Sequence, residues 1–106
     1  MTGQVEELVA ELKSGLIQLY GPNLNSILIF GSYARGEQDN ESDLDVLVIL
    51  DHFEHYGTEI DRSGHLTSDL SLKYGVSIST IFVTHQDWLE RDTPLLRNAR
   101  FEAIAA

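Results

Sequence analysis

Residues 31–50 read GSYARGEQDNESDLDVLVIL and contain most of the information about the fold. A Gly-Ser pair opens this stretch, directly after a short β-branched apolar run over residues 26–30. The stretch ends in a second apolar run, which begins with two acids. Short apolar runs between turn-forming residues are typical of buried strands. We therefore expect strands over residues 26–30 and 43–50, with a polar loop between them.

The sequence on either side of these strands has helical periodicity. Apolar residues recur every three or four positions over residues 5–20, which predicts an amphipathic helix that ends at the following Gly-Pro pair. A weaker pattern predicts a second helix over residues 60–74, and a β-branched run predicts a strand over residues 76–84. Thr93-Pro94 has the residue types of a helix start, so a last helix is expected through residues 95–101.

This order of elements predicts a single α/β (α+β) domain over residues 1–106, with helices packed on one face of a β-sheet. The loop between the first two strands is too short for an ordinary helical crossover, so we expect these strands to be antiparallel and the sheet to be mixed. A length of 106 residues is close to the usual size of one domain.

The composition excludes several classes of protein. The chain has 7 Lys and Arg against 17 Asp and Glu, and its formal net charge of −10 disfavours direct binding to a nucleic-acid backbone. Cysteine is absent, which excludes a disulfide framework and a thiolate metal site. The apolar runs are far shorter than the roughly 20 residues that span a bilayer, and the acidic N-terminal residues do not resemble a signal peptide. We expect a cytoplasmic protein with no membrane partner.

Asp43 and Asp45 are two positions apart in a predicted strand, so both side chains should leave the same face of the sheet. Two carboxylates about 5 Å apart repel each other by roughly 3 kcal/mol at an effective dielectric near 20. Such a pair must be solvated, share a proton or bind a cation. Oxygen ligands of this kind favour Mg²⁺ or Mn²⁺, and Mg²⁺ commonly takes substrate phosphates as its other ligands.

Gly31, Ser32 and Arg35 follow the end of the first strand, where α/β sheets usually bind ligands. A glycine there lets backbone N–H groups approach a phosphate closely, while the serine adds a hydroxyl and the arginine a guanidinium. For Arg35, a surface ion pair with Glu37 or Asp39 is an equal alternative. A phosphate site beside a divalent-metal site predicts the binding of a metal–nucleotide complex.

Other motifs with similar letters do not fit. Residues 37–38 are Glu-Gln where a P-loop requires Lys and Ser or Thr, and an EF-hand loop counted from Asp39 has Leu44 where it requires Gly. His52 and His55 have the spacing of a metal-binding pair, but without a third imidazole or thiolate nearby we interpret them as ordinary loop residues.

Gly31-Ser32, ten further residues and then Asp43-Leu44-Asp45 match the G-S-x10-D-x-D signature of the DNA polymerase β-like nucleotidyltransferase superfamily. Residues 31–50 more closely resemble the small bacterial minimal nucleotidyltransferases, and the chain length and the preceding helix and strand are similar too. The resemblance implies a polymerase β palm-like fold. It also implies transfer of a nucleoside monophosphate, AMP from ATP above all, from a nucleoside triphosphate to a hydroxyl.

The resemblance further implies roles for individual residues. Ser32 would contact phosphate, and Asp43 and Asp45 would be the catalytic residues that ligate Mg²⁺ or Mn²⁺. Many members of this family are encoded beside a small helical protein of the HEPN type, to which they act as antitoxin, and some adenylylate that partner.

One position departs from the family pattern. Active members have a third acid on the next strand, where this chain has Ser79 as the best match and Ser77 on the same face. Neither serine can act as a base at neutral pH, and loss of a general base commonly lowers a rate by roughly 10²–10⁴-fold. The alternatives are therefore a slow enzyme, one that borrows an acid from a partner or another segment, and a catalytically inactive binding module that serves as an antitoxin or subunit.

Overall fold

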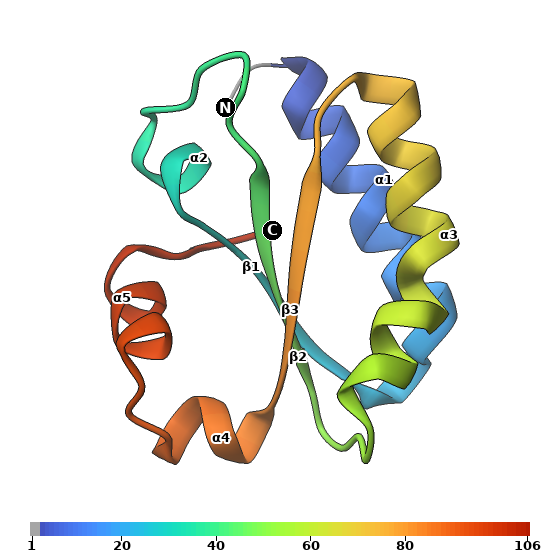
Figure 1. Ribbon diagram of the computed structural model, residues 1–106. Coiled ribbons are helices and arrows are strands. Elements are labelled where there is room, and N and C mark those ends of the chain that lie inside the picture. The colour runs from blue at the N-terminus through green and yellow to red at the C-terminus, as the bar shows by residue number, and fades with distance from the viewer. Residues whose placement is uncertain (1–2) are drawn as a thin grey trace.

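The computed structural model describes residues 3–106 and has a sheet between two groups of helices (Figure 1). The elements are, in chain order, α1 (Gly3–Tyr20), the 3-10 helix η1 (Gly21–Asn23), β1 (Leu24–Phe30), α2 (Ser32–Arg35), β2 (Leu44–Leu50), α3 (Tyr56–Tyr74), β3 (Ile78–Thr84), α4 (His85–Glu90), α5 (Pro94–Glu102) and β4 (Ile104–Ala105). Every predicted helix and strand is present. The structure adds η1, α2, α4 and β4. None of the helices in the described residues is long and apolar enough to cross a membrane.

The four strands form one mixed sheet with the order β3-β2-β1-β4. β1 and β2 are antiparallel, β2 and β3 are parallel, and β4 pairs antiparallel with β1 at the opposite edge. The antiparallel pairing of the first two strands and the mixed sheet are therefore confirmed. The antiparallel register sets Phe30, the last residue of β1, opposite Asp45 near the start of β2.

The two long helices α1 and α3 pack on one face of this sheet, as Figure 1 shows. Leu8, Leu12 and Leu16 of α1 have no exposed surface, in agreement with the predicted amphipathic pattern. They belong to the same apolar cluster as Val46 and Val48 of β2. This face holds the larger part of the core.

Helices also cover the other face of the sheet, in addition to the one face that the sequence predicts. Leu47 and Ile49 of β2 point to this side and cluster with Leu96 and Ala99 of α5 and with Trp88 of α4. β2 is apolar on both faces, a pattern typical of a strand that is buried on both sides. The six-residue α4 was missed because so short a helix has no readable periodicity.

Element boundaries differ from the predictions at polar positions. β2 begins at Leu44 and β3 at Ile78, so both strands start later than the predicted residues 43 and 76. α3 begins at Tyr56, earlier than the predicted residue 60. The side chains that its first turns bury, Glu59 and Ser63, are polar, so a search for apolar periodicity does not detect these turns. The predicted N-terminal cap of the last helix, α5, is confirmed, since the Thr93 hydroxyl accepts a hydrogen bond from the Leu96 N–H at 3.2 Å.

Candidate functional site

The residues singled out in the sequence gather at the end of the sheet where β1 ends and β2 begins. Gly31 follows directly after Phe30, and Phe30 lies opposite Asp45 in the antiparallel register. The two halves of the sequence motif, which are separated by the loop over residues 37–42, are thus neighbours in space. In Figure 1 this end of the sheet lies next to α2.

Gly31 is required by its backbone conformation and by its contact with Asp45. Its φ of 72° lies in the region that side-chain-bearing residues rarely adopt. A Cβ atom at this position would also collide with Oδ2 of Asp45. The close approach of Gly31 to the Asp45 carboxylate is the physical reason for a glycine here.

The two carboxylates differ in their surroundings. Asp45 lies on β2 and is partly buried, whereas Asp43 is exposed and lies one residue before the observed start of the strand, although the sequence predicts it to be the strand's first residue. Burial raises the pKa of the Asp45 carboxyl, and the charge of Asp43 raises it further, while the nearby Arg35 lowers it. The charged pair is therefore held in an unfavourable electrostatic environment that a bound cation would relieve.

Ser79 lies next to Asp45 in the parallel register of β2 and β3, so the two side chains share one face of the sheet. From the sequence, Ser79 is the best match to the third acid of the family pattern. Ser77 precedes β3, and its carbonyl oxygen accepts a hydrogen bond from the Leu44 N–H at 2.8 Å. The site thus contains a hydroxyl where a carboxylate is expected.

Arg35 ends α2 and makes two ion pairs. Its Nε lies 3.1 Å from Oε2 of Glu37, which is the surface pair considered from the sequence. The alternative pair with Asp39 is not formed, and Oδ1 of Asp39 instead accepts a hydrogen bond from the Glu41 N–H at 2.8 Å. The second ion pair of Arg35 is with Glu102, at 2.9 Å between Nη1 and Oε2.

Glu102 is a site residue that sequence reasoning missed. It is the last residue of α5, and its Oε1 accepts a hydrogen bond from the Gly31 N–H at 3.0 Å. The Arg35 guanidinium lowers the pKa of the Glu102 carboxyl, and the Gly31 N–H lowers it too. No local pattern indicates this role, because Glu102 and Gly31 are 71 positions apart in the chain.

The donor set at this site fits a divalent ion that binds together with a nucleotide. Within residues 3–106, no group of three or more His, Cys, Asp or Glu residues could hold a metal ion without help. Mg²⁺ commonly uses one or two carboxylates and completes its coordination with water and substrate phosphates. Asp43 and Asp45, beside the Gly31 N–H and the Arg35 guanidinium, offer ligands and donors of these two kinds.

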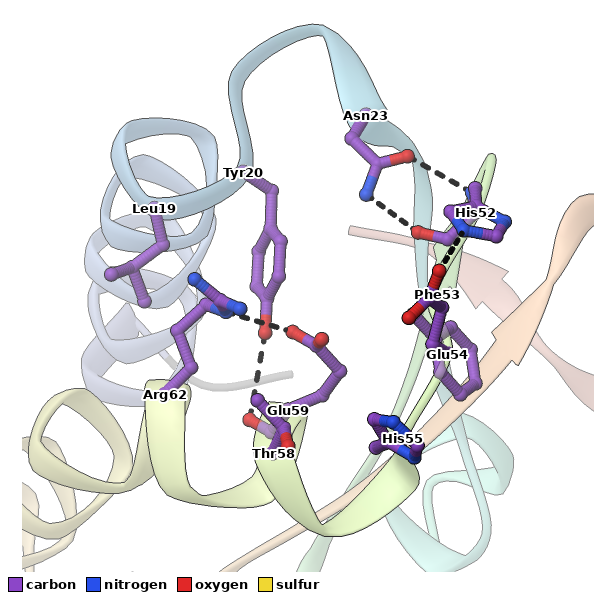
Figure 2. A pocket seen from close by; sticks show the side chains of 10 residues that line it. All are labelled: Leu19, Tyr20, Asn23, His52, Phe53, Glu54, His55, Thr58, Glu59 and Arg62. Carbon is purple, nitrogen blue, oxygen red and sulfur yellow. Dashed lines mark hydrogen bonds and ion pairs between the residues drawn. The ribbon is translucent and has the colours of Figure 1, made fainter.

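A separate cavity of about 430 Å³ lies beyond the other end of β2, between the end of α1 and the start of α3 (Figure 2). Its polar groups bind one another. Asn23 exchanges two hydrogen bonds with the backbone of His52, and the buried Glu59 pairs with Arg62 at 3.0 Å. His52 and His55 are both exposed at its rim. None of the predicted site residues lines this cavity.

The sequence matches the nucleotidyltransferase domain family over residues 9–104. A protein of Methanocaldococcus jannaschii that is named as a candidate protein adenylyltransferase is 35% identical over 78 residues, which are 74% of this chain and 78% of that protein.

Two solved structures have the same fold. A protein described as a candidate minimal nucleotidyltransferase is 26% identical and has a TM-score of 0.60, with 93% of this chain and 92% of that chain covered. A chain from the complex of a tri-AMPylated Shewanella oneidensis HEPN toxin with its MNT antitoxin is 16% identical and has a TM-score of 0.54, with coverage of 92% and 70%.

Proposed function

Because the chain belongs to the nucleotidyltransferase domain family, we propose that it transfers AMP from Mg²⁺-bound ATP to a hydroxyl group on a partner protein. The observation that carries this proposal is the juxtaposition of Gly31 and Arg35 with Asp43 and Asp45 at one end of the sheet. We propose a cytoplasmic location, where ATP and Mg²⁺ are available.

Each site residue has a role in this reaction. The N–H of Gly31, the hydroxyl of Ser32 and the guanidinium of Arg35 would hold the triphosphate, and Asp43 and Asp45 would hold Mg²⁺. When bound, Mg²⁺ would neutralise charge on the phosphates and stabilise the transition state. The acceptor hydroxyl oxygen attacks the α-phosphorus, the bond from that phosphorus to the bridging oxygen breaks, and pyrophosphate leaves.

The proton of the acceptor hydroxyl goes to solvent, because Ser79 cannot take it at neutral pH. Phosphoryl transfer depends mainly on positioning and electrostatic stabilisation, so a site without a base can still be active at a lower rate. We therefore expect a slow enzyme rather than an inactive one.

The acceptor we propose is a small helical protein of the HEPN type, to which this chain would act as an antitoxin. Two likenesses support this choice: the Methanocaldococcus jannaschii relative is named for protein adenylylation, and the Shewanella oneidensis complex contains an AMPylated HEPN toxin. The net charge of −10 supports a protein rather than a nucleic acid as the partner.

A catalytically inactive antitoxin is the second candidate function, and Ser79 is the observation that favours it. In that case the chain would neutralise its partner by binding alone. Variants that lose Asp43 or Asp45 would then inhibit the partner as well as the wild type does, provided that they remain folded.

The test is incubation with labelled ATP, Mg²⁺ and the protein product of the gene that neighbours the gene for this chain. We expect label on the partner with the wild type, and a loss of at least about 10²-fold with Asp43→Asn or Asp45→Asn. Asp61→Asn is the matched control, because Asp61 is an exposed acid on α3 far from the site. Absence of labelling by the wild type, together with unchanged inhibition by both variants, would favour the binding module.

A further inference from the structure

The donors that we assign to the phosphates of ATP already bind an anion that belongs to the chain itself. Oε1 of Glu102 accepts the Gly31 N–H at 3.0 Å, and Oε2 of Glu102 lies 2.9 Å from Nη1 of Arg35. Both carboxylate oxygens are therefore bound by groups of the proposed phosphate site.

Glu102 is held in this position by the elements around it. Its side chain is only 21% exposed. Ala99, one turn earlier in α5, is fully buried in the second apolar cluster, and Ile104, two residues later, pairs with Ile29 of β1. The carboxylate thus comes from a segment that is fixed to the sheet on both sides of it.

A carboxylate oxygen and a phosphate oxygen make the same kind of hydrogen bond to an N–H or a guanidinium. One N–H cannot serve both in the same geometry, and Asp45 already places a further negative charge beside Gly31. On these contacts, and given the proposed function, we propose that Glu102 occupies the place of a nucleotide phosphate and must be displaced before ATP binds.

This arrangement has a measurable consequence for affinity. A site that is open for only a fraction of the time has its apparent affinity reduced by that fraction. If Glu102 leaves Gly31 and Arg35 for about one tenth of the time, its removal lowers the dissociation constant about tenfold.

The experiment titrates inorganic tripolyphosphate, and separately Mg²⁺ with a non-hydrolysable ATP analogue, into the full chain by calorimetry. Glu102→Gln should bind both probes about tenfold more tightly than the wild type. Glu37→Gln is the matched control, because it removes the same charge from the same guanidinium without a contact to Gly31. We expect a change of less than about twofold for Glu37→Gln.

A second variant keeps the charge and shortens the reach. Glu102→Asp cannot bridge Gly31 and Arg35, so it too should bind tripolyphosphate more tightly than the wild type. Thermal unfolding followed by circular dichroism checks that both variants are folded.

The outcomes separate this inference from the proposed function. Equal affinity for the wild type, Glu102→Gln and Glu102→Asp would overturn the inference alone, and so would weaker binding by Glu102→Gln, which would make Glu102 a ligand of the nucleotide or its metal ion. Failure of the wild type and of every variant to bind either probe would overturn the proposed function and this inference with it.

Discussion

At the scale of the residue, a few side chains account for the chemistry of the site. Gly31 must be a glycine because a Cβ atom would collide with the Asp45 carboxylate. Asp45 in turn lies beside Ser79 of β3, the residue that the sequence resemblance matches to the third acid of the family. By that match, one carboxylate of the family pattern is missing from this site.

Ser79→Asp tests whether that missing carboxylate limits the reaction. If the proposed function is correct, the new acid beside Asp45 should raise the rate of AMP transfer by about 10²–10⁴-fold. The measurement is the initial rate of partner labelling at saturating ATP and Mg²⁺. Ser77→Asp adds the same charge before the start of β3 and should give no such increase. A Ser79→Asp rate equal to that of the wild type would show that another step is limiting.

At the scale of the element, α1 and α3 are joined by a polar contact at the edge of their apolar interface. Oε1 of Glu11 accepts a hydrogen bond from Lys73 Nζ at 2.8 Å, and the Tyr74 hydroxyl donates to Oε2 of Glu11. These hydrogen bonds, that of Lys73 first, lower the pKa of the Glu11 carboxyl. A lowered pKa means that the contact stabilises the folded chain only while Glu11 is ionised.

The lowered pKa of Glu11 predicts how the stability of the variant Glu11→Gln depends on pH. At pH 7 the variant should unfold at a lower temperature than the wild type, because it lacks the ionised carboxylate. The difference should fade as the pH falls through the lowered pKa of Glu11, where the wild type loses the same charge. Thermal unfolding between pH 7 and pH 3 measures it. Asp61→Asn, which removes an exposed acid of α3, is the control, and an unfolding difference for Glu11→Gln that persisted at pH 3 would contradict the assignment.

At the scale of the whole molecule, the sheet has a core on both faces. α1 and α3 cover one face, and α4 and α5 cover part of the other. The second, smaller cluster also positions α5, whose last residue reaches the candidate site. The same short helix, α5, therefore packs on this face of the sheet and supplies Glu102 to the candidate site.

Two neighbouring leucines of α5 test how much this second face contributes to stability. Leu96 is 3% exposed, whereas Leu95 is 41% exposed. Leu96→Ala should lower the free energy of unfolding by about 2–5 kcal/mol, because it leaves a cavity under α5. Leu95→Ala should change it by less than about 1 kcal/mol. Chemical denaturation of both variants provides the measurement, and equal losses would mean that α5 does not pack as described.

Most of the fold and both halves of the site motif are predictable from the amino-acid sequence. Apolar runs and periodicity predict α1, α3 and the three main strands, because burial on a sheet or helix face imposes local patterns. Thr93-Pro94 predicts the start of α5. The spacing from Gly31-Ser32 to Asp43 and Asp45 predicts the metal–nucleotide site, whose ligands and activity stay predictions.

The surroundings of that site, in contrast, depend on contacts between segments that are far apart in the chain. Glu102 meets Gly31 from a helix 71 positions away, and no local pattern indicates such a contact. The same holds for the packing of α4 and α5 on the second face of the sheet. Contacts between distant segments depend on how the whole chain packs, so they become visible only once the sheet and both of its layers are assembled.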